Sequence, residues 1–219
     1  MKNKEYYIEP AVLTLIAGDN RSGKNNFLMQ EFNRLSHEIN EGRLSGNVVW
    51  IVPEWLHEEE TPEAAEKENF TGPPMKGLPD FTCLILDAGT AGGNTPDTED
   101  RGTKALKHFQ TLVRTGTIRE KSTVIWDGPE NFQHPAWQIR IAELLVQYAK
   151  AGIHLVIGTH SPYIVQGIRF FSHKNDVTPL YLLVERNGEG KQTVSDVTKD
   201  LNRVFLSFAR PFNEIINLI

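Results

Sequence analysis

GDNRSGKNNF, residues 18–27, joins two segments of different hydrophobic periodicity. The preceding run AVLTLIAG (11–18) is continuously apolar and of strand length, which is typical of a strand buried on both faces in a parallel sheet. The following segment, 25–40, places apolar side chains at helical spacing, namely Phe27, Leu28, Phe32, Leu35 and Ile39. The stretch is therefore predicted to connect a buried strand to a helix.

Gly18, Gly23 and Lys24 follow the pattern Gly-x-x-x-x-Gly-Lys of a phosphate-binding loop. Glycines let the backbone wrap closely around an anion, and the N–H groups at a helix start add positive potential. The lysine would neutralise the β- and γ-phosphates of a nucleotide. The alternative is a glycine-rich turn with a solvent-exposed lysine. The candidate nucleotide-binding residues are Gly18, Asp19, Asn20, Arg21, Ser22, Gly23, Lys24, Asn25 and Asn26.

Asn25 stands where this pattern normally has Ser or Thr. A hydroxyl there is a small, hard oxygen ligand for Mg²⁺. The amide oxygen of Asn25 can also coordinate a metal, but it projects further from the backbone. We therefore expect phosphate binding to survive and Mg²⁺ binding to be weakened.

The rest of the chain alternates strand-like and helix-like segments and ends in a hairpin and a helix. Strands are predicted at 47–53, 81–89, 122–127 and 153–158, helices at 103–116 and 135–152, a hairpin at 179–198 around the turn RNGEG, and a helix at 200–219 bent or broken near Pro211. This order predicts an α/β fold with a mainly parallel central sheet flanked by helices, followed by a C-terminal β-hairpin and helix.

Residues 1–219 are expected to form a single domain, a size that suits one core. Residues 54–100 are rich in acidic, Pro and Gly residues and are predicted to form an irregular inserted or shortened lid region. The net charge of −5 gives no bulk attraction to nucleic acid, which leaves nucleic-acid binding undecided. The polar N-terminus and the lack of a long apolar run predict a cytoplasmic protein without a membrane span. A single cysteine, Cys83, excludes an internal disulfide.

Two further polar residues follow buried strands. Asp127 ends STVIWD, and His160 follows IHLVIG in the segment GTHSPYIV. Because the carboxyl ends of parallel strands meet at one edge of a sheet, both are expected to lie near the phosphate-binding loop. An acidic residue at such a strand end commonly holds Mg²⁺, so Asp127 and Asn25 are the candidate metal ligands.

Residues 123–165, from TVIWDGPENFQHPAW to GTHSPYIV, resemble the segment of ABC-type ATPases that runs from the Walker B strand to the switch histidine. The resemblance is to their soluble OLD-like and SMC-like branch and covers residues 1–50 and 100–219. It implies a P-loop NTPase fold, with Gly23 and Lys24 in the Walker A loop, Asp127 as the Walker B aspartate and His160 as the switch histidine.

The resemblance also marks departures in the hydrolytic machinery. Gly128 occupies the position of the catalytic glutamate, and glycine cannot polarise a water molecule. Arg101 precedes Gly102 where the family has the Ser-Gly pair of its signature loop. Loss of a general base typically costs ~10²–10⁴-fold in rate. Glu130 lies two residues after Gly128 and is a normal feature of the family. The candidate catalytic residues are His160 and Glu130.

The resemblance implies an ATP-binding domain that acts as a nucleotide-dependent switch, with slow or impaired hydrolysis. ATP and Mg²⁺ are the expected cofactors, and an ATP-dependent homodimer is the expected assembly. It also implies an effector partner such as a nuclease. One alternative is a nonenzymatic interaction protein that keeps the fold without nucleotide turnover. Another is a competent ATPase that uses Glu130 or a residue from a partner.

Overall fold

The computed structural model describes residues 12–18, 22–51, 101–187 and 189–216, and for 101–105 only the backbone. Six strands form one sheet in the order β2-β3-β4-β1-β5-β6. Their bounds are β1 Leu13–Gly18, β2 Val48–Ile51, β3 Thr123–Asp127, β4 His154–Thr159, β5 Leu180–Arg186 and β6 Gln192–Asp196. All neighbouring strands are parallel except β5 and β6, which pair antiparallel. The mainly parallel α/β fold predicted from the sequence is confirmed.

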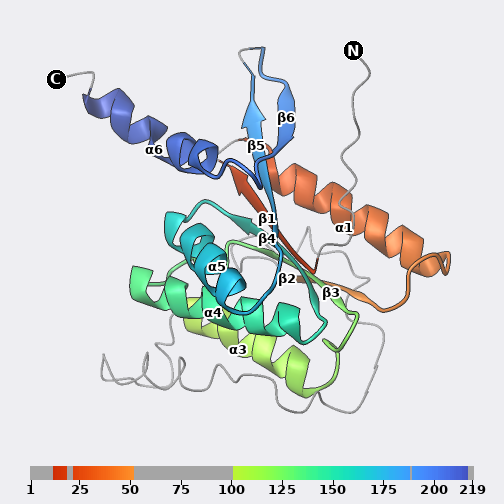
Figure 1. Ribbon diagram of the computed structural model, residues 1–219. Helices are drawn as coiled ribbons and strands as arrows, with labels where there is room; N and C mark the ends of the chain where they lie inside the picture. The colour runs from red at the N-terminus through yellow and green to blue at the C-terminus, as the bar shows by residue number, and fades with distance from the viewer. Residues whose placement is uncertain (1–11, 19–21, 52–100, 188, 217–219) are drawn as a thin grey trace.

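Helices cover both faces of this sheet (Figure 1). Their bounds are α1 Lys24–Asn40, α3 Arg101–Arg114, α4 Pro135–Lys150, α5 Pro162–Lys174 and α6 Asn202–Ile216. Side chains of β1 alternate between the faces: Leu13 and Leu15 pack into the core beneath α3, α4 and α5, and Ile16 packs into the core beneath α1. The continuous apolar run of β1 is therefore explained by burial on both faces.

The helix start and the hairpin predicted from the sequence are confirmed. Pro135 occupies the first turn of α4, where its missing N–H costs nothing, and the side chain of His134 accepts a hydrogen bond from the Ala136 N–H. The hairpin β5–β6 pairs Leu182 with Asp196 at one end and Arg186 with Gln192 at the other.

Of the two alternatives predicted for the C-terminal helix near Pro211, a bend or a break, the structure excludes the break. Helix α6 continues through this proline to Ile216. From Arg210 onward every described residue of α6 is exposed.

Helix α5 was not predicted from the sequence. Ser161 caps it by accepting hydrogen bonds from the N–H groups of Tyr163 and Ile164, and Pro162 occupies its first turn. The Ser-Pro pair followed by buried Ile164, Ile168 and Phe171 at helical spacing is the signal that would have indicated it.

Several predictions concern residues outside the described part of the chain. These are the strand at 81–89 and the lid region 54–100. The single-domain organisation of residues 1–219 also stays a prediction. Among the described residues, no helix combines the length and apolarity that a membrane crossing requires.

Candidate functional site

Lys24 and Asp127 meet at the carboxyl edge of the sheet. Lys24 begins α1 after the loop that follows β1, and Asp127 ends β3. The Lys24 Nζ atom lies 2.5 Å from Asp127 Oδ1, and both side chains are more than nine-tenths buried. A solvent-exposed lysine on a glycine-rich turn is therefore excluded, because the ammonium group is held inside the site by an ion pair.

This ion pair passes over strand β4, which lies between β1 and β3 in the sheet. Gly158 of β4 is the register partner of Asp127. A Cβ atom at Gly158 would lie 2.6 Å from Asp127 Oδ1 and 2.6 Å from Leu28 Cδ1. The absence of a side chain at this position therefore allows the carboxylate of Asp127 to approach Lys24. Sequence analysis missed Gly158, although a glycine inside an apolar strand often marks a close approach.

Gly23 gives the loop its final turn before α1. Its φ of 93° lies in the left-handed region that favours glycine. A Cβ atom here would lie 2.8 Å from Oε1 of Gln192, the first residue of β6. The hairpin therefore packs against the phosphate-loop glycine, a contact that sequence analysis did not predict.

The other residues of the candidate loop are placed only in part. Ser22 is buried and its Oγ accepts a hydrogen bond from the Lys24 N–H at 3.3 Å. Asn26 is exposed at the first turn of α1. Asp19, Asn20 and Arg21 lie outside the described residues. Gly102 lies in the first turn of α3, where only the backbone is described, so its contact with a nucleotide stays a prediction.

The two predicted Mg²⁺ ligands, Asp127 and Asn25, both contact the ammonium group of Lys24. Lys24 Nζ donates to Asn25 Oδ1 at 3.4 Å as well as to Asp127 Oδ1. Asp127 Oδ1 and Asn25 Oδ1 therefore both lie beside one cationic group. Such oxygen ligands suit Mg²⁺, whose other ligands would be phosphate and water oxygens. The described residues contain no cluster of three or more His, Cys, Asp or Glu side chains able to hold a metal by themselves.

Glu130 is bound to the end of strand β4. Its Oε1 atom accepts hydrogen bonds from Thr159 Oγ1 at 2.8 Å and from the His160 N–H at 2.9 Å. The same oxygen lies 3.5 Å from His160 Nδ1. Its other oxygen, Oε2, is buried and has no hydrogen-bond partner among the described residues. This geometry gives Glu130 the role of fixing the backbone before the histidine.

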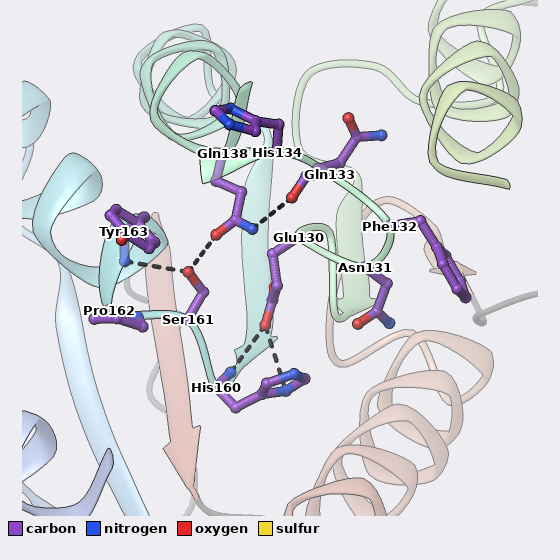
Figure 2. A pocket seen from close by; sticks show the side chains of 10 residues that line it. All are labelled: Glu130, Asn131, Phe132, Gln133, His134, Gln138, His160, Ser161, Pro162 and Tyr163. Carbon is purple, nitrogen blue, oxygen red and sulfur yellow. Dashed lines mark hydrogen bonds and ion pairs between the residues drawn. The ribbon is translucent and has the colours of Figure 1, made fainter. Parts of the chain in front are cut away.

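A shallow pocket of about 620 Å³ lies between the loop after β3 and the start of α5 (Figure 2). Asn131 and His160 both line it, and the imidazole of His160 is about half exposed. Below its rim, the Ser161 hydroxyl donates to Gln138 Oε1, and Gln138 Nε2 donates to the Gln133 carbonyl oxygen at 2.8 Å. This network joins α4 to α5 and fixes the strand end that carries His160.

Comparison with protein-family models finds one similarity. Residues 101–166, which run from α3 to the start of α5, match the model AAA_21, described as "AAA domain, putative AbiEii toxin, Type IV TA system". This match supports a P-loop NTPase-type domain. No curated protein matches the chain.

Among solved structures, the chain is similar to CbiO1 from Clostridium perfringens, described as part of the ABC transporter complex CbiONQ. The identity is 19% and the TM-score 0.47, with 95% of this chain and 85% of that chain covered.

Proposed function

We propose that this chain is an ATP-binding P-loop NTPase domain of the ABC type, which acts as a nucleotide-dependent switch and hydrolyses ATP slowly. The observation that carries the proposal is the Lys24–Asp127 pair at 2.5 Å, since it joins the two motifs that phosphate binding requires across 103 residues of sequence. The family match over residues 101–166 supports the P-loop NTPase part of this proposal.

ATP would bind by taking the place of Asp127 as the partner of Lys24. The terminal phosphates carry more negative charge than a carboxylate, and they would lie at the start of α1, where free backbone N–H groups also donate. Lys24 would then turn from Asp127 to the phosphates. The oxygen atoms of Asp127 and Asn25 would be released to hold Mg²⁺, which supplies further charge neutralisation for the phosphates.

Slow hydrolysis follows from what lies beside Asp127. Gly128 has no side chain that could accept a proton from water. The carboxylate of Glu130 is hydrogen-bonded to Thr159 and His160 through one oxygen and buried at the other. We therefore assign Glu130 to positioning His160, and His160 to contacting the terminal phosphate.

We further propose that two copies of the chain close on ATP, and that a separate effector such as a nuclease reads the closed state. The model matched by residues 101–166 is described as "AAA domain, putative AbiEii toxin, Type IV TA system", which is consistent with a domain that works beside a partner. Light scattering with and without ATP tests the first step: the mass should double only with nucleotide.

Calorimetric titration of the protein with ATP, with and without Mg²⁺, tests nucleotide binding. We expect binding in the micromolar range, which corresponds to about −8 kcal/mol, and a weak dependence on Mg²⁺ because of Asn25. Lys24→Ala should abolish the binding, and circular dichroism should first establish that this variant is folded.

Lys150→Ala is the matched control, because Lys150 is an exposed lysine at the end of α4 that leads to the amino end of β4. It should bind ATP like the unmodified chain. The proposal fails if the folded protein shows no binding at millimolar ATP, or if Lys24→Ala binds as well as the control.

A further inference from the structure

The side chain of Asn131 lies over the Cα atom of Gly128. Gly128 has a φ of +70°, and a Cβ atom built on it would contact Asn131 Nδ2 and lie 2.8 Å from Asn131 Cγ. The turn that creates this contact is closed by a hydrogen bond of 3.0 Å from the Asn131 N–H to the Gly128 carbonyl oxygen. The carboxamide therefore fills the space that a side chain at position 128 would need.

This carboxamide is available for a ligand. It is half-buried, lines the same pocket as His160, and makes no side-chain hydrogen bond within the part of the chain that the structure describes. Figure 2 shows the Asn131 carboxamide and the His160 imidazole on the same side of the pocket. An amide presents both a donor and an acceptor, so it can bind a phosphate oxygen and a water molecule together.

The neighbouring polar groups are already engaged. Asp127 Oδ1 is paired with Lys24, and Glu130 Oε1 accepts from Thr159 and His160. The free oxygen of Glu130 is buried, so it does not reach water in the pocket. Gln133 Nε2 in the same loop also has no hydrogen-bond partner among the described residues, but this atom is buried, whereas Asn131 is only half-buried and lines the pocket with His160.

We propose that Asn131 positions the attacking water in slow ATP hydrolysis, a role that rests on the proposed function above. The water oxygen forms a bond to the γ-phosphorus as the bond from that phosphorus to the β–γ bridging oxygen breaks. The electron pair leaves with ADP, and the proton of the water passes to a phosphate oxygen, because a neutral amide does not accept it. Asn131 Oδ1 accepts a hydrogen bond from the water, and Nδ2 donates to the γ-phosphate.

Asn131→Asp tests this role, because it places a carboxylate on the same atoms without adding volume. A general base is worth ~10²–10⁴-fold, so we expect kcat for ATP to rise at least about tenfold. The rate should also gain a dependence on pH, increasing as the new carboxylate ionises. Asn131→Ala should lower kcat while KM stays within about twofold, because the water loses its acceptor. A purely structural side chain would not produce opposite changes in the two variants.

Asn213→Asp, on the exposed end of α6, is the matched control and should keep the unmodified rate and pH profile. ATP binding is measured by calorimetry on every variant. The inference is overturned if the Asp and Ala variants bind ATP and hydrolyse it at the unmodified rate. If the unmodified chain does not bind ATP, the proposed function fails first and the role of Asn131 fails with it.

Discussion

Lys24 and Asp127 form an ion pair whose two side chains are both buried. Removal of one partner leaves the other charge in an apolar environment without compensation, which typically costs 3–5 kcal/mol. Each buried charge is therefore compensated by the other in the absence of nucleotide, and the pair holds the two groups ready for phosphate and metal.

Asp127→Ala should lower the free energy of unfolding by about 3–5 kcal/mol. Lys24→Met combined with Asp127→Ala should recover most of this loss, because no charge then remains buried. Urea unfolding of the single and double variants measures both effects. Equal destabilisation in the single and double variants would show that the ion pair is not the cause.

The Lys24–Asp127 ion pair lies over Gly158 of β4. Gly158→Ala places a methyl group 2.6 Å from Asp127 Oδ1 and from Leu28 Cδ1, so both must move. We expect a loss of about 1–3 kcal/mol in unfolding free energy and weaker ATP binding, measured by urea unfolding and calorimetry. An unchanged ATP affinity in this variant would mean that the clearance over Gly158 does not determine the position of Asp127 in the site.

At the scale of elements, helix α1 carries a charged cluster beyond the start that we propose binds phosphate. Glu31 is buried in this helix and accepts hydrogen bonds from Arg34 at 3.0 and 2.8 Å. Burial raises the pKa of Glu31 above its ordinary value of 4.5, and the nearby guanidinium only partly opposes this effect. The folded state therefore holds the Glu31 proton more tightly than the unfolded state does.

The stability contributed by this raised pKa is present below pH 4.5 and is lost as the pH rises through the pKa of the folded state. Glu31→Gln should therefore gain stability relative to the unmodified chain as the pH increases above 4.5. Unfolding in urea at a series of pH values measures the difference. A difference that does not change with pH would contradict the raised pKa.

At the scale of the whole molecule, one aromatic cluster connects the helical layer to the site. Phe109 of α3 is fully buried, stacks on Trp126 with ring centroids 5.2 Å apart, and meets Tyr148 of α4 edge to face at 5.1 Å. Trp126 directly precedes Asp127 on β3. The position of the aspartate therefore depends on packing between α3, α4 and the sheet.

Phe109→Ala should cost about 3–5 kcal/mol of unfolding free energy through the cavity it leaves. Because Trp126 loses its stacking partner, ATP affinity should fall as well. Phe109→Leu, which retains most of the buried volume, should show a smaller loss of both. Urea unfolding and calorimetry measure the two quantities. If stability falls in Phe109→Ala while ATP affinity is unchanged, the cluster supports the fold without influencing the site.

The sequence determined the α/β fold, the parallel strands, the terminal hairpin and the loop-to-helix phosphate motif. These features depend on local periodicity, on turn chemistry and on Gly23, whose left-handed φ a glycine adopts at little cost. The sequence also indicated that Asp127 and His160 lie at the same edge as Lys24, because parallel strands align their carboxyl ends.

Only the tertiary structure decided which side chains fill that edge. The clearance over Gly158 and the packing of Gln192 against Gly23 join residues on different strands and loops, and the contact of Asn131 with Gly128 depends on how the turn after β3 closes. Glu130 likewise became a backbone-fixing residue through its hydrogen bonds to the end of β4. Such contacts depend on strand order and side-chain direction, and the pattern of a single segment carries neither.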